Sequence, residues 1–238
     1  MESDNKIKAS VVIPALNEEK YIGKLLESLK NQSYEQPFEI IVADANSEDQ
    51  TREIARQMGA RVIIESKRSA AAERQAGAKA AQGDILVFID ADDAADHKFI
   101  EQIIKPFADP KVVLVGGALR PLEKSCFIWV SCLFWGFLVK LSIIFKKPLV
   151  CGQGLAIRKN IFEQVNGFDI EKQTAEDTLL AIKAIKLGKY KYNPKAIIYF
   201  STRRIMKMGI LNYFWFHYKN FFKTHFLNKS EEDYQPIR

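Results

Sequence analysis

The chain has 238 residues, of which 47% are hydrophobic, enough for one large globular domain with a sizeable core. Its 35 Lys and Arg residues against 29 Asp and Glu residues give a formal net charge of +6, which suits an anionic partner such as a nucleotide, a phospholipid or nucleic acid without choosing among them. Its three cysteines, Cys126, Cys132 and Cys151, are odd in number and lack CxxC spacing, which excludes a disulfide framework and a zinc motif.

The first half of the chain alternates between strand and helix patterns. Apolar runs predict strands at residues 9–15, 38–45, 60–66 and 84–92, and helical spacing predicts helices at 17–32, 47–59 and 69–83. We expect Asn17 to cap the first helix, Ser47 and Gln50 to form a capping box, and Gly59 to end the second helix. This alternation predicts βαβ units, hence an α/β fold with a mostly parallel central sheet and helices on both faces.

The second half is less regular. Its patterns predict a helix at 97–110, a strand at 111–121, helices at 155–168 and 176–188, and a late strand at 190–202, and residues 126–145 form an apolar run. We find no internal repeat and no linker. We therefore expect one domain over 1–238, which ends in an aromatic, basic tail (205–238).

Polar side chains follow three of the predicted strands. In an open α/β sheet the ligand lies beyond the carboxyl ends of the strands, so we expect these side chains to line one rim. Such an acidic rim on a basic protein suits a divalent cation that bridges to phosphates. The residues are Asn17 and Glu18 after the first strand, Asp44, Asn46 and Ser47 after the second, and Asp90, Asp92 and Asp93 after the fourth.

Basic residues are expected to close the other side of a diphosphate. The candidates are Arg68, Arg74 and the pair Arg203–Arg204, which follows the late strand and precedes a flexible MKMG stretch. The alternative for Arg68 and Arg74 is that each only solvates a helix surface. The alternative for a single aspartate at the rim, Asp90, is a helix N-cap.

Five segments in order resemble the family 2 glycosyltransferases, which have the GT-A fold, over nearly the whole chain. They are VVIPALNEEKYI, IVADANSEDQT, ERQAGAKAAQGDILVFIDADD with its Asp-X-Asp motif, CGQGLAIRKNIFEQVNGFD and AEDTLLAIKAIKLG. The resemblance implies transfer of a sugar from a UDP- or GDP-linked donor, with Mg²⁺ or Mn²⁺ as cofactor. It also implies that the domain divides into a nucleotide-sugar-binding half (1–120) and an acceptor and catalytic half (121–204).

The resemblance also implies roles for individual residues. Asp44 would hydrogen-bond the base, Asp90 would face the ribose and the metal, Asp92 would coordinate the metal, and Asp177, beside Glu176, would be the general base. Glu176 and Asp177 also begin a helix, so a capping pair is the alternative. The expected donor-binding set is Pro14, Ala15, Asn17, Glu18, Asp44, Asn46, Arg68, Arg74, Asp90, Ala91, Asp92, Arg203 and Arg204.

The sequence departs from the family pattern at several positions. Ala43 replaces a common aspartate, Ala45 and Asn46 replace two glycines, and Gln75 replaces a common asparagine, so the base, uracil or guanine, stays open. There is no Gln-X-X-Arg-Trp, the mark of processive synthases, so we expect a single addition. Direct displacement with inversion needs a carboxylate to deprotonate the acceptor hydroxyl, the role implied for Asp177.

The apolar segment 126–145 is long enough to span a bilayer, with Lys140 as its only charge. A lone span would place the Asp-X-Asp motif and Asp177 on opposite sides of the membrane, although both must meet one sugar. The segment therefore lies in the interface, covers the core or forms a dimer contact. Lys146, Lys147 and the tail residues Trp215, His217, Lys219 and Lys223 favour the interface.

We therefore expect peripheral membrane contact through 126–147 and 205–227 and a lipid-linked or saccharide acceptor. The polar amino terminus shows no signal peptide, which indicates the cytoplasm and the inner face of the cell membrane.

Two other functions compete. A sugar-nucleotide nucleotidyltransferase would need a glycine-rich loop after the first strand, yet no glycine precedes Gly23. A non-catalytic membrane-surface module would be about half this length. Scattered basic residues argue against nucleic-acid binding.

Overall fold

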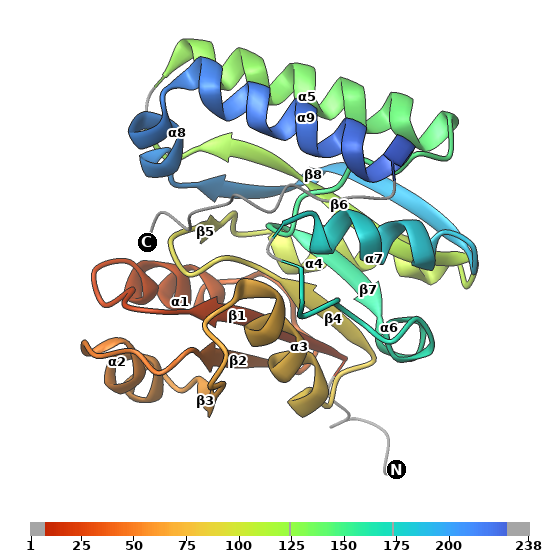
Figure 1. Ribbon diagram of the computed structural model, residues 1–238. Helices are drawn as coiled ribbons and strands as arrows, with labels where there is room; N and C mark the ends of the chain where they lie inside the picture. The colour runs from red at the N-terminus through yellow and green to blue at the C-terminus, as the bar shows by residue number, and fades with distance from the viewer. Residues whose placement is uncertain (1–7, 124, 173, 228–238) are drawn as a thin grey trace.

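The computed structural model describes residues 8–123, 125–172 and 174–227. It contains one eight-stranded sheet in the order β3-β2-β1-β4-β7-β6-β8-β5 (Figure 1). The strands are β1 (Ala9–Ala15), β2 (Phe38–Asp44), β3 (Arg61–Ile64), β4 (Ile85–Phe88), β5 (Ala94–Ala95), β6 (Val112–Pro121), β7 (Leu155–Arg158) and β8 (Lys189–Phe200).

The sheet is parallel in its first half and mixed in its second. β1 pairs in parallel with β2 and with β4, and β2 pairs in parallel with β3. β7 runs antiparallel to both β4 and β6, β6 and β8 are parallel, and the short β5 is antiparallel to β8. The predicted α/β class is therefore confirmed, and β1 and β4 end side by side at the rim where their polar residues follow.

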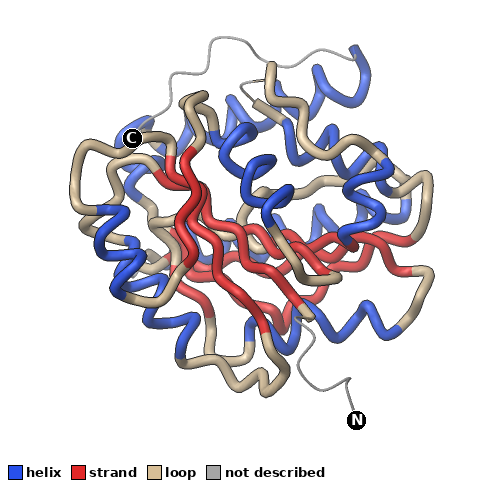
Figure 2. The backbone as a smooth tube through the Cα atoms, turned by 90° about the horizontal axis from the view of Figure 1, so that it is seen from below, coloured by secondary structure: helices blue, strands red, loops and turns tan. Residues whose placement is uncertain are grey.

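Helices cover both faces of the sheet (Figure 2). The helices are α1 (Ile22–Lys30), α2 (Thr51–Gln57), α3 (Ala70–Ala80), α4 (Phe99–Ile104) with a 3₁₀ turn at Lys105–Ala108, α5 (Cys126–Ile144), α6 (Lys159–Gln164), α7 (Glu176–Ala184), α8 (Arg203–Met208) and α9 (Ile210–Leu227). Apolar residues of α1, α2 and α4 pack against one face, and those of α3, α6 and α7 against the other. Because successive strand residues alternate between faces, Val11 and Ile13 join the first core and Val12 the second.

Several local predictions are wrong in detail. Helix α1 begins at Ile22, so Asn17 is not its cap; Asn17 has a positive φ and accepts the N–H of Glu48 through its side chain at 2.8 Å. Helix α2 begins at Thr51, and Ser47 bonds across loops rather than in a capping box. The expected stop at Gly59 is confirmed by its φ of 82°.

The second half departs further from the predicted elements. The segment expected to be helical at 155–168 begins with strand β7, which is inserted between β4 and β6. The helix expected at 97–110 gives way to a 3₁₀ turn at Lys105. The pair Arg203–Arg204 does not lead into a flexible stretch, because it opens helix α8.

Helix α5 confirms the long apolar segment as a helix and places it against the sheet. Ser125 caps it by accepting the N–H of Ile128. Strand β6 precedes α5 and strand β7 follows it, and these two strands are hydrogen-bonded neighbours. The chain therefore returns to the same sheet after α5, and both halves of the domain lie on one side of this helix.

Candidate active site

A cavity of about 580 Å³ opens at the carboxyl ends of β1 and β4 and extends under α5, α8 and α9. Eleven of the sequence-predicted site residues line it: Pro14, Glu18, Arg68, Arg74, Asp90, Ala91, Asp92, Glu176, Asp177, Arg203 and Arg204. Four others, Ala15, Asn17, Asp44 and Asn46, lie outside its lining. The fold thus brings together the Asp-X-Asp motif of the first half and the Glu176–Asp177 pair of the second.

Arg74 joins these two acidic groups. It projects from α3 with only 5% of its surface exposed, and donates to Asp90 at 2.6 Å and to Glu176 at 2.7 Å. Burial alone would lower the pKa of its guanidinium, but the two carboxylates outweigh burial and raise it. Arg74 is therefore a permanently charged internal link and not a solvated helix residue, the alternative that its helical position had left open.

Asp90 is held from two directions. Its second oxygen accepts the side-chain N–H of Gln153 at 3.1 Å. Burial would raise the pKa of this carboxyl, but Arg74 and Arg204 lower it overall, so Asp90 stays ionised. Sequence reasoning missed Gln153, which lies in the quoted CGQG stretch but has no charge to draw attention to it.

Arg203 forms a second bridge over the rim. It donates to Glu18 at 2.6 Å, pairs with Asp92 at 2.8 Å and stacks over the Tyr21 ring at 4.5 Å from the ring centre. Its two carboxylate partners follow β1 and β4, so one side chain from α8 spans the rim. Arg203 holds a position from which it can exchange carboxylates for phosphate oxygens, which offer the same bidentate acceptor geometry.

The carboxyl groups of this rim repel one another. Burial, followed by the charge of Asp90, raises the pKa of Asp92, and the same causes raise the pKa of Asp93 well above its ordinary value. Burial also raises the pKa of Glu18. The buried Oδ1 of Asp93 and Oε2 of Glu18 have no hydrogen-bond partner. The rim therefore holds unpartnered acceptor oxygens and mutually repelling carboxyl groups, both of which a cation would satisfy.

A metal ion fits this donor set when it arrives with a substrate. Within residues 8–123, 125–172 and 174–227, no three His, Cys, Asp or Glu side chains are arranged as a complete ligand group. Mg²⁺ typically binds through one or two carboxylates and completes its shell with water and phosphate oxygens. Asp92 and Asp90 would supply the hard oxygen ligands of such a partial site.

Asp177 lies at the cavity side of the first turn of α7. Burial, followed by the charge of Glu176, raises the pKa of its carboxyl to about 7. Its Oδ1 accepts the backbone N–H of Thr178 at 2.6 Å. Asp177 does not cap α7, whose N-cap position is Ala175 with a left-handed φ of 60°. A carboxyl with a pKa near neutrality in a cavity is suited to take up a proton.

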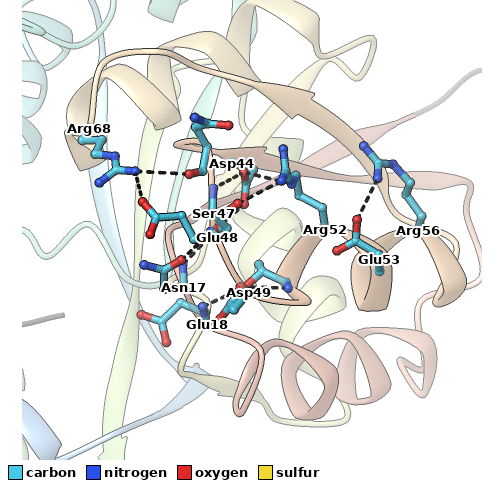
Figure 3. A network of polar contacts seen from close by, with 12 residues as sticks. Asn17, Glu18, Asp44, Ser47, Glu48, Asp49, Arg52, Glu53, Arg56 and Arg68 are labelled. Carbon is cyan, nitrogen blue, oxygen red and sulfur yellow. Dashed lines mark hydrogen bonds and ion pairs between the residues drawn. The ribbon is translucent and has the colours of Figure 1, made fainter.

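Asp44 belongs to a separate network beside the cavity (Figure 3). Its side chain is fully buried, accepts the N–H and the hydroxyl of Ser47, and lies 3.8 Å from Arg52. Ser47 in turn accepts the backbone N–H of Asn17 at 2.9 Å. This network joins the loops after β1 and β2, and it leaves the exposed Asn46 beside Arg68, whose guanidinium pairs with Glu48 at 2.8 Å.

Helix α5 has an exposed apolar face as well as a packed one. Phe127, Val130, Phe134, Phe137, Leu141 and Ile144 recur at helical spacing and are 37% to 73% exposed; we call them the outer stripe of α5. Among the described residues, Cys126–Ile144 is the one helix long and apolar enough to cross a membrane by length and composition. A water-soluble surface rarely leaves such a continuous apolar stripe uncovered.

Comparison with known proteins adds relatives and structural neighbours. The chain is 25% identical over 231 residues to a dolichyl N-acetyl-alpha-D-glucosaminyl phosphate 3-beta-D-2,3-diacetamido-2,3-dideoxy-beta-D-glucuronosyltransferase of Methanococcus voltae, covering 84% of this chain and 69% of that protein. It spans 50% and 38% of the lengths of two other glycosyltransferase relatives.

Two solved structures share the fold. The mannosyltransferase PcManGT of Pyrobaculum calidifontis, in complex with GDP-Man and Mn²⁺, has a TM-score of 0.73 and 21% identity, covering 97% of this chain and 67% of that one. S. aureus TarS 1-349, in complex with UDP-GlcNAc, has a TM-score of 0.63 and 24% identity, covering 83% and 59%. These likenesses confirm the predicted GT-A fold.

The family model for glycosyl transferase family 2 matches residues 10–165, from strand β1 through helix α6. That match includes the rim after β1, the Asp-X-Asp motif, Arg74 and Gln153. The chain belongs to glycosyl transferase family 2 and is a glycosyltransferase.

Proposed function

We propose that the protein transfers a single sugar from a UDP- or GDP-linked donor to a lipid-linked acceptor, with metal dependence and inversion at the anomeric carbon. The observation that carries this proposal is the single cavity in which Asp90 and Asp92 lie with Arg203, Arg204 and Asp177. It combines groups for a diphosphate with a carboxyl suited to take a proton. The neighbours that bind UDP-GlcNAc and GDP-Man support a nucleotide-sugar donor of either kind.

The donor diphosphate would lie over the rim. Arg203 and Arg204 would neutralise its oxygens once Arg203 leaves Glu18 and Asp92. Mg²⁺ or Mn²⁺, bound through Asp92 beside Asp90, would supply further neutralisation of the leaving diphosphate when present. Arg74 would hold Asp90 and Glu176 in place from below. Because the Asp44 carboxylate is fully buried, we expect it to shape the base-binding loop rather than contact the base in this conformation.

Transfer would proceed by direct displacement. The acceptor oxygen attacks the anomeric carbon as the bond to the diphosphate oxygen breaks, and the nucleoside diphosphate departs with that electron pair. Asp177 takes the proton of an attacking hydroxyl. One face is attacked as the opposite bond breaks, so the configuration inverts. The absence of a Gln-X-X-Arg-Trp sequence supports a single addition.

The acceptor side would meet a membrane. The outer stripe of α5 suits a helix lying in the headgroup layer, with Lys146 and Lys147 at its carboxyl end to meet anionic lipid. Strand β6 precedes α5 in the chain and strand β7 follows it, yet the two strands pair with each other. This pairing supports contact of α5 with the membrane surface rather than a single transmembrane span. The Methanococcus voltae relative is named for a dolichyl-linked substrate, which supports a lipid-linked acceptor. We place the enzyme peripherally on the cytoplasmic face.

Calorimetric titration tests the donor assignment. UDP and GDP are each titrated with and without Mn²⁺ into wild type, Asp92→Asn and the matched control Asp109→Asn, whose carboxylate lies outside the cavity. We expect one nucleotide to bind with Mn²⁺, at least about tenfold more weakly in Asp92→Asn and unchanged in the control. If neither nucleotide binds the folded protein with Mn²⁺, the donor site is wrong and a non-catalytic membrane-surface module becomes the better interpretation.

A further inference from the structure

A small apolar cluster lines part of the cavity. Its members come from five elements in two separate segments of the chain: β6 and α5 in the first, and β8, α8 and α9 in the second. Ile128, Cys132, Phe200 and Ile205 are between 3% and 8% exposed, and Leu119 and Tyr213 pack against them. All six line the same cavity as Asp177 and the Asp-X-Asp motif. We call these six residues the apolar chamber.

The chamber is largely separate from the two cores that hold the sheet together, and of its six residues Leu119 also packs against one of them. Its four buried residues belong to neither of the large clusters on the two faces of the sheet. A sugar nucleotide carries no hydrocarbon chain to fill it, because its only apolar surfaces are the flat faces of its base and sugar rings and its remaining groups are polar. The proposed donor therefore accounts for the polar end of the cavity and leaves the chamber without a ligand.

The border between the two ends is sharp. Helix α8 presents Arg203 and Arg204 to the polar end and, one residue later, Ile205 to the chamber. Across the cavity, Ser131 and Cys132 of α5 stand next to each other in the lining. A molecule that fits both ends has an anionic group joined directly to a hydrocarbon chain.

Helix α5 lies between the chamber and the outside of the molecule. Ile128 and Cys132 face the chamber, while Phe127, Val130 and Phe134 of the outer stripe are more than half exposed on the same turns. In Figure 1, α5 and α9 lie together over one end of the molecule. A chain held in the chamber by one face of α5 could thus continue along its other face into a bilayer.

From this arrangement, and resting on the proposed function, we propose that the apolar chamber holds the first isoprenoid units of a polyprenyl-phosphate-linked acceptor. The phosphate would lie toward Arg204, and the group to be glycosylated would lie within reach of Asp177. The chamber would therefore select the acceptor by its chain, whereas the polar end selects the donor.

Binding of prenyl phosphates tests this proposal without any turnover. Dimethylallyl, geranyl and farnesyl phosphate carry one, two and three isoprene units, and inorganic phosphate serves as the headgroup alone. Each is titrated by calorimetry, without detergent, into the full chain. We expect affinity to rise more than about tenfold with each unit that the chamber encloses, since each buried methylene is worth about fourfold, and to level off once the chamber is full.

Two substitutions on the same helix separate the chamber from the outer stripe. Cys132→Trp fills the chamber, and we expect it to lower the affinity for farnesyl phosphate at least about tenfold. Phe134→Trp changes the outer stripe, where the side chain is 60% exposed, and we expect less than about a twofold effect. Should Cys132→Trp fail to fold, Ser131→Phe, also in the lining, takes its place.

Nucleotide binding with Mn²⁺ is measured on the same preparations. The proposal is overturned if the nucleotide binds while affinity for the phosphates does not grow with chain length, or if Phe134→Trp weakens farnesyl phosphate and Cys132→Trp does not. If the folded wild-type protein bound no nucleotide with Mn²⁺, the proposed function would be overturned, and the chamber proposal with it.

Discussion

Replacing Asp177 by Asn should remove activity and stabilise the fold. Burial and Glu176 raise the pKa of Asp177 to about 7 from an ordinary 3.8. Above neutral pH the carboxylate is ionised in the folded state, and this ionisation destabilises the fold. A shift of about 3 units corresponds to about 4 kcal/mol. Because the residue is only partly buried, solvent screening reduces this, and we expect Asp177→Asn to gain about 2 kcal/mol at pH 8.

The gain should depend on pH with a definite sign. A carboxyl whose pKa is raised on folding stabilises the folded state at low pH and loses that contribution as pH rises from its unfolded pKa to its folded pKa. Asn mimics the neutral form. The variant and wild type should therefore unfold alike near pH 4, and the difference should grow until about pH 7 and then stay constant.

Thermal unfolding and sugar transfer measure the two effects. About 2 kcal/mol should raise Tm at pH 8 by about 4–8 °C in a chain of this length. Transfer should fall by about 10²–10⁴-fold, the usual contribution of a general base. In wild type, kcat/KM should rise with pH through an apparent pKa near 7. Glu163→Gln, at an exposed carboxylate 3.9 Å from Lys159, is the matched control and should change neither quantity appreciably.

An Asp177→Asn variant that transfers sugar at the wild-type rate would refute the base assignment. The electrostatic reasoning would be refuted if the variant were less stable than wild type at pH 8. It would also be refuted if the Tm of the variant differed from that of wild type by the same amount at pH 4 and pH 8. Loss of activity together with a pH-independent loss of stability would mean that the carboxylate serves the fold through its bond to Thr178 rather than the chemistry.

Three further substitutions probe the Arg74 link, the outer stripe of α5 and the packing of α3 against β1. Arg74→Met leaves the carboxylates of Asp90 and Glu176 without their cationic partner, and it should lower the free energy of unfolding in urea by about 3–5 kcal/mol. Arg74→Lys should retain part of that stability. Phe134→Glu should reduce sedimentation with anionic liposomes several-fold at low salt, and the control Leu187→Glu, also at an exposed apolar residue, should not. Gly77→Ala drives a methyl group into a valine of β1 and should cost about 1–3 kcal/mol, whereas Gly23→Ala, whose nearest neighbour would be at 3.8 Å, should be neutral or stabilising.

The first half of the fold could be predicted because its signals are local. Each of strands β1 to β4 is an apolar run followed by polar residues, and each intervening helix shows its apolar spacing within one segment. Since β1 and β4 are parallel neighbours, the residues after them meet, and the grouping of Glu18 with Asp90 and Asp92 follows from that topology.

The predictions that failed depend on contacts between distant segments. Asn17 and Ser47 are suitable helix caps, but each finds its partner in the other's loop, and a cap and a cross-loop hydrogen bond are both worth about 1 kcal/mol. Strand β7 has only four residues and runs directly into α6, so its pairing with β4 and β6 is its one distinguishing mark.

Arg74 shows the same limit inside the site. Its position in an alanine-rich helix allowed a surface role, and the decision depended on Asp90 and Glu176, which are 16 and 102 residues away in the chain. Arg68, on the same approach to α3, has a half-exposed side chain paired with Glu48 and keeps the solvated position that its sequence equally allowed. Both arginines line the cavity, and they differ because only Arg74 lies between its two acidic groups, Asp90 and Glu176.

Helix α5 gains its meaning from the difference between its two faces. The sequence is apolar all round, which fits a span, a core helix or an interfacial helix equally well. The fold uses one face, through Ile128 and Cys132, to enclose the cavity, and this use explains the apolar residues on that face. The outer stripe remains 37% to 73% exposed. A helix that only completed the domain would carry polar residues there, so its second apolar face indicates a function outside the domain, at the surface where a lipid-linked acceptor would arrive.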